Sequence, residues 1–416
     1  MTSPNPLTAA RQTASTAEPG HRPGTAGYRR VVLSLFAAGV ATFTLIYGSQ
    51  SLFPALAADF EVSAADSTLS LSLTTGALAL TLLLAGPLSD RIGRTRLIHA
   101  SLLTSVVVAA ASAVAPTWPT FLGLRLVLGV TIAGLPAVAT AYLREELRRG
   151  AQARAAGLYI GGNAIGGMTG RLATGPVADL WGWRWALGAV AALALVCAVV
   201  VWFALPASRH FVPRPAGRRN ALAMTRRALS DPVLLALYGI GMLGCGAFVA
   251  VFNALGFRLT GPQFGLSLGA ASLVFLVYAC GSFGSAVAGR LADRFGRRAV
   301  APAGAVLALA GLAVTLSGNL AAVVAGVALM TAGFFVVHGV ASGWVPVRAH
   351  AGGVAAGQAA SLYLFAYYLG SSLCGTAGGH AWSYAGWPGV VTLSAVLFGG
   401  AGLLSLLVRR TPALTP

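Results

Sequence analysis

Apolar runs recur along almost the whole sequence, and each is long enough to cross a lipid bilayer as a helix of about 20 residues. We locate these runs at about residues 30–56, 68–89, 97–116, 119–142, 154–178, 185–205, 232–257, 268–289, 299–317, 319–343, 355–379 and 387–408. Hydrophobic residues make up 56% of the 416-residue chain and charged residues only 9%, whereas soluble domains carry roughly 25% charged residues. This composition excludes a soluble enzyme and predicts an all-α membrane protein with 12 transmembrane helices.

The basic residues are unevenly divided between the two sides of such a bundle. All 28 are arginine, and 24 of them fall in the N-terminal stretch, the loops after even-numbered helices and the C-terminal end. Only Arg184 and Arg258 fall on the opposite side. The positive-inside rule therefore predicts cytoplasmic termini for a multi-pass membrane protein. The arginines that give the net charge of +18 thus set the orientation of the helices in the membrane. We therefore expect the lipid bilayer as a partner and no nucleic acid.

Two polar stretches divide the chain into domains. Residues 1–27 are rich in Pro, Thr, Ser, Ala and Gly and lack an apolar period, so they are predicted to be a disordered cytoplasmic tail. The first apolar run is much longer than the roughly 7–15 apolar residues of a signal peptide, so we expect a retained helix and not a cleaved signal. The arginine-rich stretch 206–231 predicts a cytoplasmic central loop between two six-helix bundles, at 28–205 and 232–408, and residues 409–416 a second tail.

The two predicted bundles share a repeat. The string Gly86-Pro-Leu-Ser-Asp90-Arg91-Ile-Gly93-Arg94 returns 203 residues later as Gly289-Arg-Leu-Ala-Asp293-Arg294-Phe-Gly296-Arg297. The same offset relates Gln50 in the first helix to Asn253 in the seventh. A six-plus-six layout with a parallel repeat indicates a pseudo-two-fold axis and is typical of transporters that bind their substrate between the halves.

Both copies of this string resemble the signature loop of the major facilitator superfamily, and the resemblance extends over residues 28–408. Within that superfamily, two strings resemble the YnfM-like group of bacterial inner-membrane exporters. They are Gly161-Gly-Asn163-Ala-Ile-Gly166-Gly167-Met-Thr-Gly170-Arg171 and Ser361-Leu-Tyr363-Leu-Phe-Ala-Tyr367-Tyr368-Leu-Gly370-Ser-Ser. The resemblance implies the superfamily fold and secondary transport by alternating access, with no cofactor.

The signature loops are the predicted gating motif. Its residues are Gly86, Asp90, Arg91, Gly93 and Arg94, and in the second copy Gly289, Asp293, Arg294, Gly296 and Arg297. Glu145 and Glu146 follow the fourth helix on the same side and can pair with the loop arginines, and the resemblance implies a latch on the cytoplasmic gate. The loop between helices 10 and 11 offers Arg348 and His350 but no acid, so an asymmetric latch is expected. The alternative is a charged loop that only enforces topology.

Two arginines fall inside predicted membrane helices, where a charge costs about 2.5–3.5 kcal/mol unless it faces a cavity or a partner. Arg125, with Gly129, resembles an arginine-glycine motif of proton-coupled family members and is a coupling candidate. Its alternative role is to donate hydrogen bonds to the backbone of helix 1 or 2. Arg171 stands where a related antiporter motif has proline, and it is predicted to face the substrate cavity. Its alternative is snorkelling toward the outer surface.

Acidic residues are missing from the middle of the predicted helices, so the usual first-helix carboxylate of drug/proton antiporters is absent. Asp59, at the outer end of that helix, and His338, in the tenth, are therefore coupling candidates. A solvated helix-end acid is the alternative for Asp59. For His338 the alternative is a hydrogen-bonded packing role, although histidine titrates in the range that suits proton exchange.

The remaining polar and aromatic residues define the predicted substrate cavity, with core packing as the alternative for each. They are Tyr47, Gln50, Asn163, Arg171, Asn253, Tyr363 and Tyr367. We expect a monomer that exports a small amphipathic organic compound or drug in exchange for protons. The alternative is a facilitator or exchanger of a small organic or inorganic anion. A membrane enzyme or sensor is a remote alternative, since the sequence offers no catalytic cluster, no large output domain and no metal-ligand spacing among its four cysteines.

Overall fold

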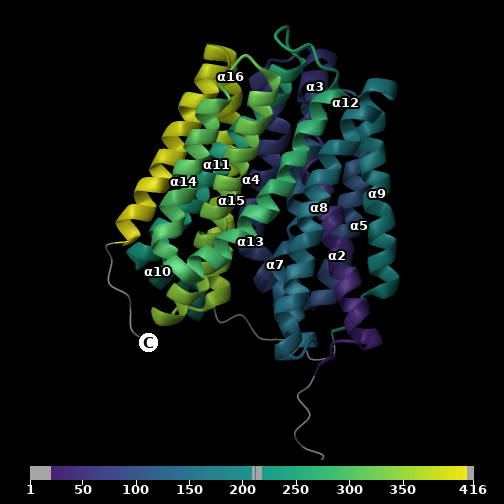
Figure 1. Cartoon of the computed structure of the whole chain (residues 1–416). Coiled ribbons are helices and arrows are strands. Elements are labelled where there is room, and N and C mark those ends of the chain that lie inside the picture. The colour runs from purple at the N-terminus through teal and green to yellow at the C-terminus, as the bar shows by residue number, and fades with distance from the viewer. Residues whose placement is uncertain (1–19, 209–210, 212–217, 410–416) are drawn as a thin grey trace, which may run out of the picture.

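The computed structural model describes residues 20–208, 211 and 218–409 of the chain (Figure 1). The side chains of residues 218–222, 282, 283, 285, 286, 288, 292 and 293 lie outside the described part. So do most of the predicted N-terminal tail, part of the central loop, the last seven residues and the carboxylate of Asp293. Every named element within the described part is helical.

The N-terminal half consists of α2 (Ala26–Tyr47), η1 (Gln50–Leu52), α3 (Phe53–Asp59), α4 (Ala64–Ile92), α5 (Arg94–Ala113), α6 (Trp118–Ile132), α7 (Gly134–Glu146), α8 (Arg149–Trp181) and α9 (Trp183–Ala204). The C-terminal half consists of α11 (Pro232–Thr260), α12 (Leu268–Ser272), η2 (Leu273–Val277), α13 (Tyr278–Phe295), α14 (Arg297–Val314), α15 (Leu320–Ala351) and α16 (Ala356–Arg409). The two halves lie side by side in Figure 1, purple to blue and green to yellow.

These elements make twelve membrane crossings within the described residues. The first crossing is α2, η1 and α3 in succession, the fourth is α6 with α7, and the eighth is α12, η2 and α13. The helix α16 makes two crossings, because Gly386 interrupts its helical backbone at φ 60°. Nine spans of the described chain are long and apolar enough to cross a membrane by composition alone. The remaining crossings are α8, whose run of glycines lowers its hydropathy, α12–α13 and the second part of α16.

The start of α2 and the end of α16 lie on one face of the bundle, which we name the terminal face, and α3 and α12 lie on the far face (Figure 1). On the terminal face, the structure differs from the prediction for residues 206–231. A helix, α10 (Arg218–Ser230), fills half of this polar stretch. Its Ala228 is fully buried against the C-terminal half, and Thr225 accepts a hydrogen bond from Gln358 of α16. The burial of one small apolar face explains why an arginine-rich loop is helical here.

The predicted tail also differs from the structure in its last residues. The backbone of His21 pairs with Glu146 and Arg148 at the end of the fourth crossing. Thr25 then caps α2, which begins at Ala26. Because this capping hydroxyl satisfies a free N–H group of the first turn, the helix starts before the apolar run that marks it in the sequence.

Glycines of α8 set the close approach of the first and fifth crossings. Gly162, Gly166 and Gly170 lie on the face of α8 that contacts the backbone of α2, and a Cβ on Gly166 would overlap the carbonyl oxygen of Val40. Small residues four apart let two helix backbones approach closely in a membrane, where no hydrophobic force drives the helices together. This contact holds the helix that carries Arg171 against the helix that carries Tyr47.

Replacing Gly166 with alanine is expected to destabilise the protein by about 1–3 kcal/mol, the usual cost of overpacking an interior. The measurement is the thermal unfolding midpoint of the purified protein in detergent. Gly161→Ala is the matched control on the same helix, because a Cβ at residue 161 meets no described atom within 4 Å. Equal midpoints for the two variants would contradict the packing role of the glycine face.

Candidate functional site

A chain of buried polar side chains crosses from one half of the protein to the other. The Arg171 Nε donates to Gln50 Oε1 at 2.5 Å, and the Gln50 Nε2 donates to Asn253 Oδ1 at 2.7 Å. Asn253 in turn donates to the carbonyl of Gly375 in α16. Gln50 and Asn253 are the residues that the 203-residue repeat relates. Since residues related by a two-fold axis meet only at that axis, this hydrogen bond marks the pseudo-two-fold at the interface.

Aromatic rings from both halves surround the Arg171 guanidinium. Its central carbon lies 3.9 Å from the ring centroid of Tyr47, 4.5 Å from Tyr278 and 5.3 Å from Phe275. The side chain is only 1% exposed, and a further N–H group donates to the carbonyl of Gly167. Within the described residues Arg171 forms no ion pair. Ring faces and neutral oxygens attract its charge, as they do any desolvated guanidinium, but no described acid neutralises it.

The rings near Arg171 continue into an aromatic cluster of the C-terminal half. Its members are Phe248, Phe252, Phe275, Tyr278, Phe334, Phe335, His338, Tyr363 and Tyr367. Phe248 stacks on Phe334 at 4.2 Å, and His338 lies 4.9 Å from Tyr367. The Nδ1 of His338 and the hydroxyl of Tyr363 are 2.9 Å apart. Tyr278, Phe335, His338 and Tyr367 are half-buried, whereas Phe248, Phe252, Phe275, Phe334 and Tyr363 are buried.

The structure brings together most of the predicted cavity residues, but not all of them. Tyr47, Gln50, Arg171 and Asn253 form the polar chain and its ring cover, and Tyr363 and Tyr367 belong to the aromatic cluster. Asn163 is not part of either group. It lies two turns before Arg171 on α8 and packs against Gly39 of α2.

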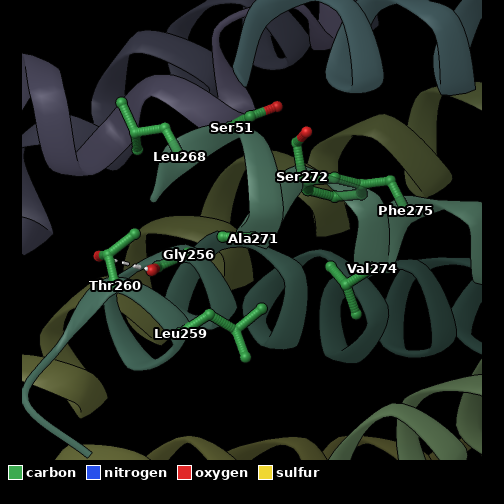
Figure 2. Close-up of a pocket in the computed structure, with 9 residues that line it drawn as sticks. All are labelled: Ser51, Gly256, Leu259, Thr260, Leu268, Ala271, Ser272, Val274 and Phe275. Carbon is green, nitrogen blue, oxygen red and sulfur yellow. Dashed lines mark hydrogen bonds between the residues drawn. The ribbon is translucent and has the colours of Figure 1, made fainter. Parts of the chain in front are cut away.

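Polar contacts between the halves lie toward the far face. The carboxylate of Asp179, at the end of α8, accepts hydrogen bonds from the backbone N–H groups of Leu268 and Gly269 at 3.0 and 2.8 Å. Ser372 of α16 donates to the carbonyl of Ser72 in α4. Figure 2 shows a small pocket in the same layer, where Ser51 of η1 faces residues of α11, α12 and η2. One wall of this pocket is Phe275, a ring that also covers Arg171.

Arg125 donates hydrogen bonds to the backbone of the first and second crossings, which is the alternative to a role in coupling. Its guanidinium donates to the carbonyls of Leu45 and Ile46, at the end of α2, and to that of Ser70 in α4. The first crossing is broken between α2 and η1, and carbonyls at a helix end have no partner within the helix. In a membrane such carbonyls need a donor from the protein, and Arg125 supplies it.

The other coupling candidates have different surroundings. Asp59 accepts from Trp183 Nε1 at 2.9 Å and pairs with Arg184 at 3.0 Å on a half-exposed surface of the far face. These are the contacts of a solvated helix-end acid. His338 instead lies within the aromatic cluster, against Tyr363 and Tyr367.

The N-terminal gating loop forms a charged cluster on the terminal face. Arg94 pairs with Asp90 at 2.7 Å and with Glu145 at 3.1 Å, so the cluster is confined to its own half. Gly93 ends α4 with φ at 95°, a conformation that favours glycine. Arg91 is exposed, whereas Glu146 is fully buried and its backbone carbonyl accepts from His21. A Cβ on Gly86 would meet no described atom within 4 Å.

The described residues of the second copy have different contacts from those of the first. Arg294 and Arg297 are exposed, and Arg294 lies over the ring of its neighbour Phe295. Gly296 has φ at 82°, and Gly289 faces open space among the described residues. Asp231, whose side chain is described, pairs with Arg348 at 2.9 Å and also caps α11.

Several residues that shape the site were missed at the sequence level. Phe248 and Phe334 carried no polar signal, and Tyr278 was not selected with the other tyrosines. Aromatic residues four apart at 248 and 252, and at 334 and 338, nevertheless indicate a shared ring face. Arg258 was assigned to an outer loop, but it is buried and donates to the carbonyls of Thr315 and Ser317 at the end of α14.

The fold and this interface agree with comparisons to known proteins. A family model described as Major Facilitator Superfamily matches residues 35–282. The chain belongs to this superfamily. It is 40% identical to the inner membrane transport protein YnfM of Escherichia coli strain K12, over 93% of this chain and 92% of that protein. It is also 40% identical to the uncharacterized MFS-type transporter YybF of Bacillus subtilis strain 168, over 89% and 91% of the two chains.

Solved structures of the superfamily share the fold. A bacterial homologue of the human lysosomal transporter Spinster, in an inward-facing and unoccupied conformation, matches with a TM-score of 0.78 at 16% identity, over 94% of this chain and 98% of that chain. A D-xylose-proton symporter matches with a TM-score of 0.68 at 15% identity, over 92% and 96%. This superfamily member is therefore a multi-pass secondary transporter with the twelve-helix fold.

Replacing Arg125 with glutamine is expected to lower the stability of the transporter, because each buried carbonyl left without a donor costs about 1–3 kcal/mol. The unfolding midpoint in detergent is the measurement, and Arg96→Gln, at an exposed position of α5, is the control. A normal midpoint combined with lost proton dependence of transport would instead assign Arg125 to coupling.

Proposed function

We propose that this transporter exports a small amphipathic organic compound across the bacterial plasma membrane in exchange for protons, as a monomer with cytoplasmic termini. The observation that carries the proposal is the aromatic cluster of the C-terminal half, with Arg171 of the N-terminal half against its edge. Concave sites lined by rings with few polar groups suit drug-sized amphipathic ligands. The cluster meets the interface at the pseudo-two-fold axis, where transporters of this layout bind their substrates.

A relative supports a drug-like substrate. The chain is 30% identical to a chloramphenicol resistance protein of Streptomyces lividans, over 67% of this chain and 69% of that protein. Export of a compound of this size, with an aromatic ring and polar groups, fits an aromatic cluster that has hydrogen-bonding groups at Tyr363, His338 and Gln50.

His338 is the coupling group that the proposal favours. It shares a hydrogen bond with Tyr363 and contacts the rings against which a substrate would pack. A proton and a substrate would therefore compete for the same surroundings. Arg125 and Asp59 are weaker candidates, because helix-end carbonyls and a surface ion pair already account for them.

Expression in efflux-deficient bacteria tests the proposal. Accumulation of a dye and drug panel is expected to fall on expression of the transporter, and a protonophore is expected to restore it. Reduced accumulation that a protonophore leaves unchanged would remove proton coupling, and unchanged accumulation across the panel would remove drug export.

The same assay tests whether His338 couples export to protons. His338→Gln is expected to abolish the protonophore-sensitive part of export, and His350→Gln, at an exposed position of the same helix, is the matched control.

The gating loop yields a further prediction within this proposal. Asp90→Asn is expected to lower turnover about fivefold or more at normal surface expression, because a shift of about 1 kcal/mol between two gate states changes their ratio about fivefold. The variant removes one partner of Arg94 and leaves Glu145 as the other. The measurement is the initial rate of export, normalised to surface expression. A wild-type rate for the variant would contradict a gating role and leave the loop with a role in topology alone.

Arg171 favours a second candidate, a facilitator or exchanger of a small anion. A buried guanidinium without an ion pair in the described chain attracts negative charge, which a neutral drug site would not need. Transport that tolerates a protonophore but depends on an anion on the opposite side of the membrane would support this candidate.

A further inference from the structure

Arg171 differs from the other enclosed arginines in what balances its charge. Arg94 and Arg348 pair with carboxylates, and Arg125 donates to carbonyls at helix ends. Arg258 serves a helix end in the same way. Arg171 contacts the amide of Gln50, the carbonyl of Gly167 and three rings. Its positive charge is therefore uncompensated by any described acid, and it lies where the two halves meet.

The partners of Arg171 divide between the two halves. Gln50, Gly167 and Tyr47 belong to the same half as Arg171, whereas Tyr278 and Phe275 belong to the other. Movement of the halves away from each other at this level would remove two ring faces and the bond from Gln50 to Asn253. The guanidinium would then keep the ring face of Tyr47, the Gln50 amide and the Gly167 carbonyl, and the face that Tyr278 and Phe275 cover would be uncovered.

The chemistry on either side of the guanidinium indicates which anion fits. Arginine binds a carboxylate through two parallel N–H···O bonds of about 2.7–2.9 Å. Tyr278, which covers Arg171, also contacts Phe248, Phe252 and Phe335 of the aromatic cluster. A ligand whose negative group reaches Arg171 would thus place its next atoms against ring faces. An aromatic ring fills that position with offset or edge contacts.

We propose that Arg171 and the aromatic cluster together form a recognition site for a small aromatic organic anion. Its carboxylate binds the guanidinium in place of the Gln50 amide, and its ring packs against Tyr278 and the neighbouring rings of the aromatic cluster. This assignment rests on the proposed transport of a small organic compound and names the chemical class of that compound. Gln50 acts as the neutral stand-in that satisfies Arg171 while the site is empty.

Binding of two matched probes to the purified full-length transporter tests the assignment. Salicylate and salicylamide have the same ring and hydroxyl, and only salicylate carries a carboxylate. Isothermal titration in detergent is expected to give at least tenfold tighter binding of salicylate, which is about 1.4 kcal/mol. Equal affinity for the two probes, or no binding of salicylate, would overturn the proposal without the need for any variant.

Variants locate the charge that is recognised. Arg171→Gln is expected to lose the tenfold preference for salicylate, and Arg171→Lys to retain part of it, because the ammonium keeps the charge without the planar fork. Arg184→Gln is the control, since Arg184 is half-exposed on the far face and pairs with Asp59. An unchanged preference in folded Arg171→Gln would place the anion elsewhere and overturn the assignment.

The two proposals fail in different ways. Protonophore-sensitive export of neutral compounds without a preference for salicylate would leave the proposed function standing and remove the aromatic anion. Preferential salicylate binding without proton-driven export would retain this site and remove proton-coupled efflux.

Discussion

The hydrogen bond between Gln50 and Asn253 joins the two halves at the pseudo-two-fold axis, because two residues related by that axis can touch only there. An amide pair on a pseudo-two-fold axis is self-complementary, since each side chain carries a donor and an acceptor. This contact therefore connects the sequence repeat with the structure, since it places two repeat-related residues of the parallel bundles at their interface. Arg171 binds the same amide, so its charge is held at the axis and not at the lipid surface.

Most of the other buried charged side chains donate hydrogen bonds to backbone carbonyls at helix ends. The first crossing is broken after Tyr47, and in a membrane the exposed carbonyls need donors from the protein. Arg125 supplies them for α2, and Arg258 does the same at the end of α14 in the other half. Donors of this kind stabilise a break within a crossing. The broken helix also brings η1 and its Gln50 to the interface, so the site depends on Arg125 without containing it.

Much of the fold was predictable because periodicity and charge asymmetry are properties of single segments. The apolar runs gave twelve crossings, and the repeat placed Gln50 and Asn253 in corresponding positions. The helix α10 was missed because one buried residue, Ala228, leaves little trace in a basic sequence. The ring cover of Arg171 was missed because Phe275 and Tyr278 approach it from a helix a hundred residues away. Such contacts depend on how the halves meet, which no local pattern encodes.

The contacts between the halves are distributed unevenly between the two faces of the bundle. The hydrogen bonds from Asp179 and Ser372 lie toward the far face, whereas Asp90, Arg94 and Glu145 pair within one half on the terminal face. Gly86 and Gly289 have open space around them there, so that face can still approach its counterpart. Arg171 lies about two turns of α8 before Asp179, on the same side of the interface as these hydrogen bonds. Since its ring cover comes from both halves, a separation of the halves on this side would uncover the charge.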